Sequence, residues 1–470
     1  MFHLLRLIAC AALSVLAVSA QIFPLDPDFH PDISGNLNTQ FTAVLDVAVQ
    51  TNGQVIAVGS FTNVNGFVRN GVVRLDADGC VDQLFDVGTG ANDQIWCVTL
   101  DNAGRIYLGG SFTTWNGSES GPLVRLLPTG EIDPTFALNG FSTIIPDSRM
   151  EIYDIHVQDD SNIHVAGFFT HYFGVLRPIL IRIDDQGSLY NSYVPDPQNL
   201  VLAVERSLRH PGHLYITGGF RDIANQPPGI AARITFEGIA DRGFSPSFGQ
   251  DDLGYAITET SGGAIYVGGD FEGPLVRKLD PQGVADPSFD IQFAAHESFY
   301  VATLLPRGES VFVGGFFDVV DGPLRTCLVL VNSDGAVNRQ FGTTGANDVV
   351  NKLAFDRAGN LLVAGAYTTI DGQPRTSLAR YLAPKITLTN PTFSNGRFEF
   401  AFNSESGARY LVQVKSSLEG AWTTIETLDG TGDLMPVDIE AEATHLFFRV
   451  EKEDDGAERT QFLTKQSRSC

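Results

Sequence analysis

Acidic residues recur just ahead of several apolar, strand-like segments, where they could bind a cation or a hydroxyl-rich ligand. Asp93 and Asp348 each close a Gly-Ala-Asn-Asp sequence, and Asp252 follows another aspartate. When the repeated units are aligned, Glu151 lies one position away from the place that Asp93, Asp252 and Asp348 share. Carboxylate oxygens are hard ligands that suit Ca²⁺, but Asn and Asp are also common turn residues. A solvated acidic rim is the favoured interpretation, and a Ca²⁺ or ligand site is the alternative.

Aromatic and histidine residues supply a second set of candidates. Trp115 and Tyr172 are expected in loops, where exposed rings could stack on sugars and buried rings would pack on a neighbouring loop. His156, His164 and His171 cluster in one stretch and could form a metal or catalytic group. No H-x-x-x-H spacing accompanies them, so core or surface histidines are favoured. The sequence contains no G-x-S-x-G, phosphate-binding or EF-hand motif, and no catalytic residue is predicted.

An arginine recurs in a third strand-like segment of nearly every unit, followed by an aspartate such as Asp82 or Asp133. A ring of cations could hold an anion. One ion pair per unit is the favoured interpretation, because a feature repeated in each unit usually stabilises that unit, and Arg and carboxylate pair in bidentate geometry. The predicted structural arginines, interrupted at Leu330, are Arg74, Arg125, Arg182, Arg233, Arg277 and Arg380.

These residues are positioned by a repeat with a period near fifty. Each copy is a β-branched and aromatic strand that ends in small residues and an aromatic ring. An apolar strand and a tight turn such as Asn52-Gly53 precede it, and a polar loop, the arginine strand and an Asp-to-Phe tail follow. About four short antiparallel strands per unit are typical of a propeller blade. The seven copies span residues 54–61, 105–112, 162–169, 213–220, 264–271, 310–317 and 360–367.

The seventh unit stops near Leu382 without its Asp-to-Phe tail. The missing piece is present near the start of the chain, as Asp26-Pro27-Asp28-Phe29. Closing the ring in this way would remove exposed sheet edges. The sequence therefore predicts an all-β fold, namely a seven-bladed β-propeller over residues 21–383 that is closed by the N-terminal strand.

The units resemble the delta-60 repeat family, whose units combine a strand ending in Gly-aromatic, an arginine strand and a G-x-x-D-x-x-F tail. The resemblance covers about residues 22–383. The third unit departs from it, with Tyr190 and Tyr193 around a tail that lacks the aspartate. The resemblance implies a propeller of a secreted or surface protein without a defined activity.

The two ends of the chain differ from the repeat. Residues 1–20 are expected to be a signal peptide, with Arg6 before an apolar stretch and Val18-Ser19-Ala20 before the cleavage point. A lipidated Cys10 is the alternative. Residues 384–453 alternate apolar and polar residues and predict a small β-sandwich-like domain. Residues 454–470 are expected to be a polar tail.

Charge and cysteine content limit the partners. The 470 residues carry 31 Lys plus Arg against 55 Asp plus Glu, a formal charge of −24. A polyanion repels phosphate groups, so nucleic-acid and anionic-membrane binding are not expected. No apolar run is long enough for a transmembrane segment. Cys80, Cys97, Cys327 and Cys470 are too few for a disulfide scaffold, although a Cys80–Cys97 bridge remains open.

The combined prediction is a secreted, extracellular or periplasmic scaffold that binds a protein or polysaccharide without catalysis. Its binding face would be formed by loops at the channel mouth, and no cofactor other than Ca²⁺ is considered. A propeller enzyme that acts on a glycan or small molecule is one alternative, and an adhesive or surface-layer component is another. The predicted ligand-binding residues are Asp93, Glu151, Asp252, Asp348, Trp115 and Tyr172.

Overall fold

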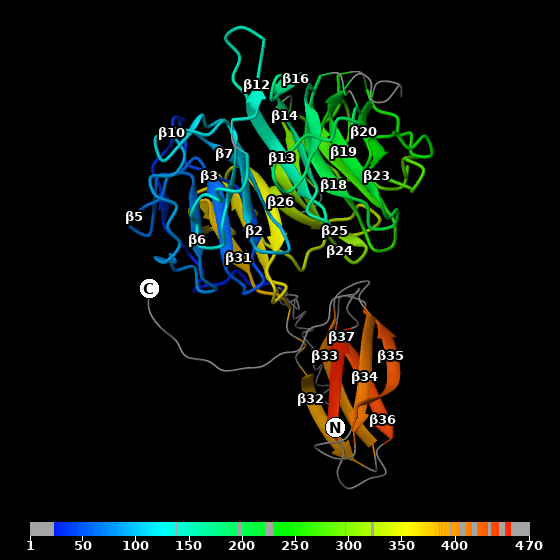
Figure 1. The fold of residues 1–470 in the computed structure, drawn as a ribbon. Coiled ribbons are helices and arrows are strands. Elements are labelled where there is room, and N and C mark those ends of the chain that lie inside the picture. The colour runs from blue at the N-terminus through cyan, green and yellow to red at the C-terminus, as the bar shows by residue number, and fades with distance from the viewer. Residues whose placement is uncertain are drawn as a thin grey trace, which may run out of the picture.

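The computed structural model describes most of the chain between residues 23 and 452. The described residues are 23–137, 139–195, 197, 199–220, 229–249, 251–296, 298–320, 324–384, 386, 388–394, 397–404, 409–415, 421–430, 434–440 and 447–452. The expected signal peptide with Cys10, and the expected tail at 454–470 with Cys470, lie outside these residues. The described elements are all strands, so the all-β prediction is confirmed (Figure 1). No helix of the described residues is long and apolar enough to cross a membrane.

Seven three-stranded antiparallel sheets repeat one order within the described residues, in which the second strand of each unit lies between the first and the third. The first strands are β2 (Val44–Val49), β7 (Ile95–Leu100), β13 (Glu151–Val157), β18 (Val201–Arg206), β21 (Leu253–Glu259), β24 (Tyr300–Arg307) and β27 (Val350–Phe355). The second strands are β3 (Val55–Gly59), β8 (Ile106–Gly110), β14 (Ile163–Phe168), β19 (His213–Phe220), β22 (Ile265–Asp270), β25 (Ser310–Val319) and β28 (Leu361–Gly365). The third strands are β6 (Val72–Leu75), β11 (Leu123–Leu126), β17 (Leu180–Ile183), β20 (Gly229–Thr235), β23 (Val276–Leu279), β26 (Arg325–Val331) and β31 (Leu378–Tyr381).

Short outer strands accompany the main sheets in several units: most follow the second strand, whereas Ile33–Ser34 and Phe141–Ser142 precede the first strand. They form from the polar loops, and Asn65 and Asn116 adopt the left-handed backbone that their tight turns need. The outer strands are β1 (Ile33–Ser34), β4 (Asn63–Val64), β5 (Phe67–Val68), β9 (Thr114–Trp115), β10 (Ser118–Glu119), β12 (Phe141–Ser142), β15 (His171–Tyr172), β16 (Val175–Leu176), β29 (Thr369–Ile370) and β30 (Gln373–Pro374).

The predicted fourth strand of each unit is only a single bridged pair. Leu75 pairs with Val81 in the first unit, and Leu126 pairs with Ile132 in the second. Beyond this pair the tail aspartate redirects the chain, because the Asp82 carboxylate accepts a hydrogen bond from the Leu84 N–H at 2.9 Å. This side-chain bond forms a turn and competes with further sheet pairing. The prediction of four strands per unit is therefore wrong in this detail.

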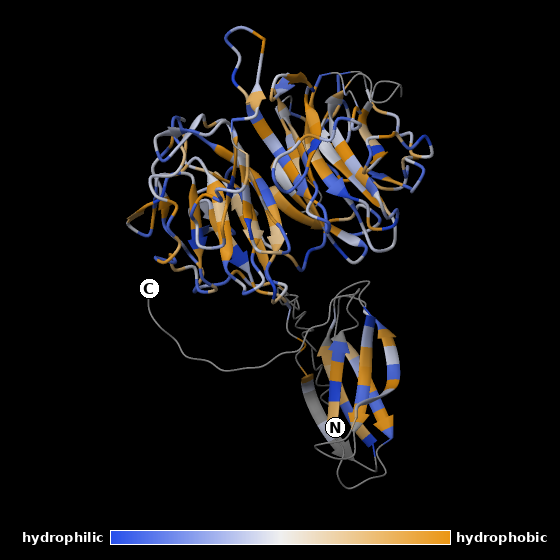
Figure 2. Cartoon of the chain, viewed as in Figure 1, coloured by the Kyte–Doolittle hydropathy of each residue, from blue (hydrophilic) through white to orange (hydrophobic). Residues whose placement is uncertain are grey.

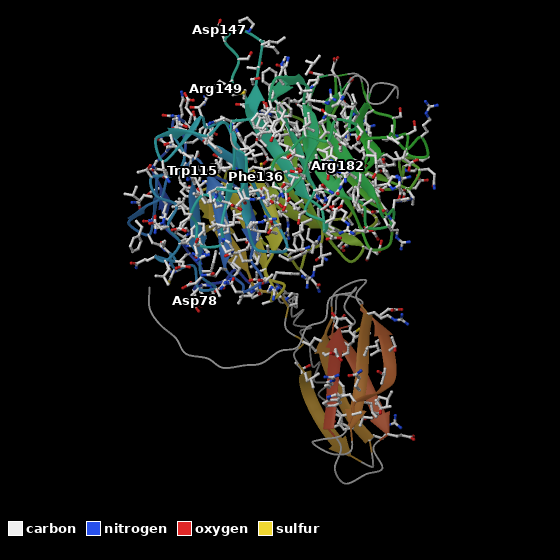
Figure 3. The ribbon with its side chains drawn as sticks, in the orientation of Figure 1. Asp78, Trp115, Phe136, Asp147, Arg149 and Arg182 are labelled. Atoms are coloured by element: carbon white, nitrogen blue, oxygen red, sulfur yellow. The ribbon has the colours of Figure 1, made fainter. Side chains whose placement is uncertain are left out.

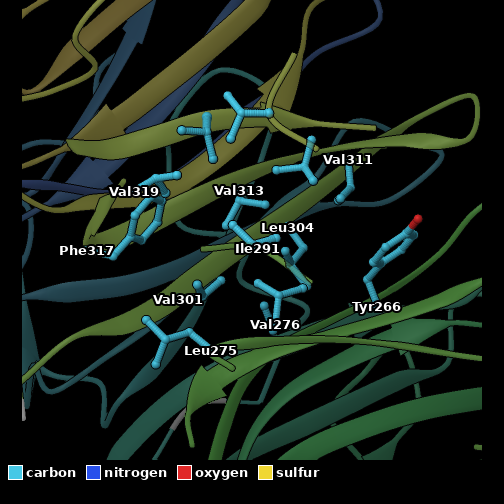
Figure 4. Packing of buried hydrophobic residues seen from close by; sticks show 14 of the residues in the cluster. Tyr266, Leu275, Val276, Ile291, Val301, Leu304, Val311, Val313, Phe317 and Val319 are labelled. Carbon is cyan, nitrogen blue, oxygen red and sulfur yellow. The ribbon is translucent and has the colours of Figure 1, made fainter. Parts of the chain in front are cut away.

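The sheets are arranged so that each first strand contacts the next, and β27 contacts β2. Apolar clusters fill the space between neighbouring sheets. Figure 4 shows one such cluster, in which Tyr266 and Val276 of the fifth sheet pack with Val301, Val311 and Val313 of the sixth. Figure 2 shows hydrophobic residues along the strands and hydrophilic residues in many connecting loops. Because each cluster draws on two sheets, no unit buries its apolar surface alone.

The N-terminal segment lies against the seventh sheet. Leu25 pairs antiparallel with Tyr381, and the Asp26 N–H donates to the Arg380 carbonyl at 2.8 Å. Phe23 is fully buried against Phe312 of the sixth sheet. The segment therefore occupies the place that each tail takes in the other units.

The C-terminal strands form two further three-stranded sheets, ordered β32-β33-β36 and β35-β34-β37. Their buried core includes Phe400, Phe402, Tyr410, Val412 and Val437. These strands are β32 (Leu388–Ser394), β33 (Arg397–Asn403), β34 (Arg409–Lys415), β35 (Thr423–Asp429), β36 (Leu434–Glu440) and β37 (Phe447–Lys452).

Candidate functional site

Asp93 is a buried carboxylate with partners of its own. Arg149, from the long loop between β12 and β13, forms an ion pair with it and also donates to the Ser111 carbonyl at 3.2 Å. The Gln94 N–H donates to the second carboxylate oxygen at 2.8 Å. Figure 3 shows Asp147 at the tip of this projecting loop and Arg149 closer to the ring. Asp93 therefore anchors a loop.

Two more of the predicted rim carboxylates are occupied by the protein itself. Asp252 is buried, accepts hydrogen bonds from the Gly249 and Glu272 N–H groups at 2.7 and 2.9 Å, and lies 3.6 Å from Arg277. Glu151 accepts a hydrogen bond from the Tyr153 hydroxyl at 2.7 Å. These contacts satisfy the carboxylates locally.

Asp348 differs from the other three because it is exposed, and its carboxylate accepts a bond from the adjacent Val349 N–H at 2.7 Å. Within the described residues, no group of three or more His, Cys, Asp or Glu side chains is placed to hold a metal ion. The Ca²⁺ hypothesis therefore gains no support from the rim, and Asp348 is the rim carboxylate that remains accessible to a ligand.

Trp115 and Tyr172 are buried, so the expectation that they offer exposed stacking surfaces is wrong. Each has an exposed fraction of 1%. Trp115 packs on Phe112 with ring centroids 5.8 Å apart, and the Tyr172 hydroxyl donates to the Gly187 carbonyl at 2.7 Å. The physical reason is their place in the outer hairpins, where the equivalent residue, Val64 in β4, also faces inward. Aligning the hairpins with one another would have found this.

The three histidines do not form one group. His156 and His164 lie on paired strands with ring centroids 6.4 Å apart, whereas His171 lies on β15 of another sheet. His164 is fully buried and hydrogen-bonds Gln158 at 2.7 Å and the Tyr193 hydroxyl at 3.2 Å. Burial holds its pKa well below the usual range and lowers the pKa of His156 to about 4. His164 is therefore a neutral core histidine.

The arginine column forms ion pairs within units, as the favoured interpretation predicted. Arg125 is fully buried and lies 2.8 Å from Asp133, with its guanidinium 4.7 Å from the Phe136 ring centroid. Arg74 pairs with Asp82 at 2.7 Å and also donates to a carbonyl of the next unit. Each such arginine thus links the Asp-to-Phe tail of its own unit to the neighbouring unit. Equivalent inter-unit bonds reach Pro128 from Arg74, Asp185 from Arg125, Phe236 from Arg182, Pro281 from Arg233 and Ala77 from Arg380.

Arg277 does not belong to this column, which is a correction to the predicted set. Its neighbour Lys278 lies opposite Tyr266 and bonds Asp286 at 3.0 Å. Arg277 points the other way, toward Asp252 and over the Phe248 ring. The spacing in the sequence carried the signal: Arg74, Arg125 and Arg233 precede their aspartates by eight residues, and so does Lys278.

Arg182 is the column member without an aspartate. Its guanidinium lies 4.6 Å from the Tyr190 ring centroid and donates to the Phe236 carbonyl at 3.0 Å. Figure 3 labels Arg182, Phe136 and Trp115 within the body of the ring. The third unit therefore keeps the inter-unit hydrogen bond and lacks the ion pair with a tail aspartate, and Arg182 instead lies 3.9 Å from Glu237 of the next unit.

A register shift early in every first strand creates inward-facing positions that sequence reasoning missed. In each strand one extra residue is inserted. Where the side chain after it is Asp46, Asp154 or Thr303, it accepts a hydrogen bond from the first strand of the next sheet. Asp46 accepts bonds from the N–H groups of Val47 and Val98, at 2.8 and 2.9 Å. Those inner N–H groups would otherwise lack a protein partner. The seven residues after the shift are Asp46, Cys97, Asp154, Ala203, Ala256, Thr303 and Lys352.

Charged side chains of several sheets meet at the centre of the ring, the space that the seven first strands enclose. The Lys352 ammonium lies 3.3 Å from the Asp46 carboxylate, and its side chain is 42% exposed. Asp46 raises the pKa of Lys352, and Asp154 and Glu205 act in the same direction. Because these residues come from the first, third, fourth and seventh sheets, only the centre can bring them together.

Glu205 is the carboxylate of this group with no hydrogen bond or ion pair among the described residues. The Glu205 side chain is exposed, but the protein around the centre of the ring displaces much of the bulk water that would otherwise solvate its carboxylate. This burial raises the pKa of Glu205 to about 7, the charge of Asp154 acts in the same direction, and Lys352 opposes both. Burial likewise raises the pKa of Asp154. Asp154, Glu205 and Lys352 are called the central charge set below.

Cys97 is a free, buried thiol, and so is Cys327. The Cys80–Cys97 bridge that the sequence left open is therefore not formed. The Cys97 sulfur lies at one of the inward positions, 3.9 Å from the Ile152 carbonyl oxygen. Burial raises its pKa well above the usual range, so it is a poor nucleophile and a poor metal ligand.

Comparison with known families identifies the repeats. Residues 50–85 and 104–136 match a family described as a domain of unknown function (DUF5122) beta-propeller. Residues 339–371 match a family described as a beta-propeller repeat. The chain is therefore built from β-propeller repeats. No curated protein sequence matches it.

Solved structures share only a distant likeness. Sqt1 of Saccharomyces cerevisiae is 9% identical with a TM-score of 0.43, and the match covers 73% of this chain and 96% of that one. The extracellular domain of BT3049, a putative hybrid two component system of B. thetaiotaomicron, is 11% identical with a TM-score of 0.27, covering 90% and 68%. Dihydro-heme d1 dehydrogenase NirN is 10% identical with a TM-score of 0.38, covering 78% and 77%. At these TM-scores the likeness carries no argument about function.

Proposed function

We propose that this protein is a secreted, non-enzymatic binding scaffold, in which a seven-bladed propeller presents a polysaccharide site at the mouth of its central channel. The N-terminal segment completes the seventh blade and closes the ring. Residues 384–453 form a small sandwich that spaces or attaches the propeller. The resemblance to the delta-60 repeat family and the apolar stretch in residues 1–20 support export.

One observation carries the proposal: the central charge set breaks the repeat. Residues that the fold needs recur from unit to unit, as Arg74 and Arg125 do. Glu205 stands where the other first strands have Ala48, Thr99, His156, Thr258, Leu305 and Ala354. An unpaired carboxylate at the centre costs stability, because burial disfavours its charged form. A polar ligand that hydrogen-bonds Glu205 would offset this cost.

Affinity electrophoresis tests the proposal. The chain is run through native gels that contain hydroxyethylcellulose, xylan, pectin or glycol chitosan, and retardation by at least one of these polymers is expected. The double variant Glu205→Gln/Lys352→Met should lose the retardation while keeping a cooperative thermal melt. Asp147→Asn/Arg242→Met is the matched control, because it likewise removes one negative and one positive charge, both from exposed positions.

Two results would contradict the proposal. One is that no polymer retards the wild-type chain. The other is that the double variant is retarded as strongly as the wild type, which would move the site away from the central charge set.

A second candidate function, hydrolysis of a glycan, is favoured by one specific observation. Asp154 and Glu205 both have raised pKa values, and carboxyl groups in unequal environments supply the acid and base of glycoside hydrolysis. Release of reducing ends from the retarding polymer would support this candidate if Glu205→Gln abolished it. Retardation without any release would leave the binding scaffold as the function.

A further inference from the structure

Three partly exposed aromatic side chains lie in contact where the first strands of the fifth and sixth sheets begin. The ring centroids of Tyr255 and Tyr300 are 5.4 Å apart, and those of Tyr300 and Phe316 are 6.4 Å apart. Tyr300 and Phe316 are paired residues of β24 and β25. All three side chains are half-buried, so each keeps part of its ring surface accessible. This set is called the mouth aromatics.

The repeat does not require aromatic residues at these positions. Tyr255 is the inserted residue of its first strand, and Leu45 and Asn351 occupy that place in the first and seventh units. The first unit has Ala43 in place of Tyr300 and Ser60 in place of Phe316. The second and third units carry aromatic residues at some of these positions, namely Trp96, Tyr153 and Phe168. The first and seventh units fold without any, so the fold does not require the mouth aromatics.

Polar groups beside the mouth aromatics are available to a ligand. Among the described residues, the hydroxyl groups of Tyr255 and Tyr300 have no hydrogen-bond partner. Asp348 is exposed and lies two residues before β27, which packs against β24 and β25, the strands of Tyr300 and Phe316. Burial raises the pKa of Tyr300, and Tyr255 and Asp348 act in the same direction. The site therefore combines aromatic faces, two free hydroxyl groups and one accessible carboxylate.

We propose that the mouth aromatics and Asp348 bind an amino sugar unit of an oligosaccharide, an inference that rests on the proposed function and names its ligand class. The apolar C–H face of a sugar ring packs against Tyr and Phe rings. A protonated amine pairs with the Asp348 carboxylate and is attracted to the aromatic faces. The tyrosine hydroxyl groups bond the sugar hydroxyls. A neutral sugar would use the rings but leave Asp348 without a counter-ion.

Isothermal titration with two matched probes tests this site. The β-1,4-linked glucosamine hexamer carries amino groups, and cellohexaose has the same linkage without them. At pH 6 the amino hexamer should bind about tenfold more tightly than cellohexaose, which corresponds to one favourable charge interaction. Asp348→Asn should remove this preference, and the affinity for cellohexaose should stay unchanged.

The variant Tyr255→Leu/Tyr300→Ala/Phe316→Ser installs at each position a residue that the first unit already uses. It should fold with a cooperative melt and bind both probes at least tenfold more weakly. Trp96→Leu is the matched control, since Trp96 is the inserted residue of the second unit. This control should bind like the wild type.

The outcomes separate this inference from the proposed function. Equal affinity of the two probes, or full affinity of the triple variant, overturns the amino sugar site. If the amino hexamer does not bind but another polymer is still retarded in a Glu205- and Lys352-dependent way, the ligand class is wrong and the scaffold stands. If no carbohydrate binds at all, both fail.

Discussion

Arg380 and Asp26 form an ion pair at 2.7 Å although 354 positions separate them in the sequence. Their geometry repeats that of Arg74 and Asp82, which are eight residues apart. Arg380 also lies 4.4 Å from the Phe29 ring centroid and donates to the Ala77 carbonyl of the first unit. One side chain thus joins the seventh unit, the N-terminal segment and the first unit.

Asp26→Ala should destabilise the protein by about 2 kcal/mol, because the largely buried Arg380 loses its nearer carboxylate and keeps Asp356 at 3.8 Å. Asp82→Ala is the matched control, with the same local contacts inside one continuous unit. Chemical denaturation gives the free energy of unfolding of each variant. Hydrogen exchange at residues 23–29 should accelerate in Asp26→Ala and stay slow in Asp82→Ala.

Deleting residues 21–40 is the stronger version of this test. The deletion should lower the melting temperature and broaden the transition of the whole ring. An unchanged, cooperative melt would show that the ring does not depend on the N-terminal segment.

Acid should destabilise the native state through His164 before most carboxylates titrate. Its native pKa lies well below the unfolded value near 6.5, so the unfolded chain takes up a proton that the native chain does not. Stability is therefore lost as pH falls below about 6.5, by up to about 1.4 kcal/mol per pH unit. His156, with a pKa of about 4, adds to the loss over the same window.

His164→Tyr should reduce this loss, because Tyr107 and Tyr215 occupy the equivalent position in other units and do not titrate there. The measurement is the urea midpoint at pH 7.5 and at pH 5. The same decrease in wild type and variant would assign the acid sensitivity to other groups.

Glu205 should have the opposite dependence on pH. Its native pKa of about 7 lies above the unfolded value, so the native state holds a proton that the unfolded chain releases. The stabilising difference is present below the unfolded pKa and is lost as pH rises through 7. Glu205→Gln should therefore raise the melting temperature at pH 8 and change it little at pH 4. A variant that melts like the wild type at both pH values would show that the charged Glu205 carboxylate does not destabilise the native state.

Arg149→Ala should release the loop between β12 and β13 with little effect on global stability. Arg149 is 58% exposed, and exposed ion pairs contribute about 0–1 kcal/mol. Proteolysis within residues 143–149 should become faster, because the link to Asp93 and Ser111 is lost. Arg177→Ala, on another outer loop, serves as the control. Equal cleavage rates in wild type and Arg149→Ala would mean that other contacts hold the loop.

Much of the fold could be predicted because it depends on local, repeated signals. Alternating strands, turn glycines and the arginine with its tail aspartate act within about fifty residues. Units one and two could therefore be aligned residue by residue. The error at Arg277 arose because two cations are adjacent in the third strand of that unit. The eight-residue spacing to Asp286 favours Lys278, and its pairing with Tyr266 confirms this assignment.

The candidate site was less predictable, because exposure is a tertiary property. Asp93, Asp252 and Asp348 look alike in sequence, yet partners bury the first two and leave the third exposed. For Trp115 and Tyr172 the sequence left exposed rings and packed rings as alternatives, and the structure buries both in their hairpins. One two-residue strand taken alone does not reveal which of its faces will be covered, whereas comparison with the equivalent buried Val64 does.

The amino-acid sequence alone determined the repeat, the all-β character and the acidic charge, since these follow from composition and short-range spacing. Only the tertiary structure decided what lies at the centre. Glu205 and Lys352 are 147 positions apart in the chain, and each lies in a strand whose sequence pattern does not predict a binding residue. They come together because the first strands of distant units enclose one space, and water is partly displaced from it. Because distant first strands meet there, Glu205 becomes a candidate residue for binding a polar ligand.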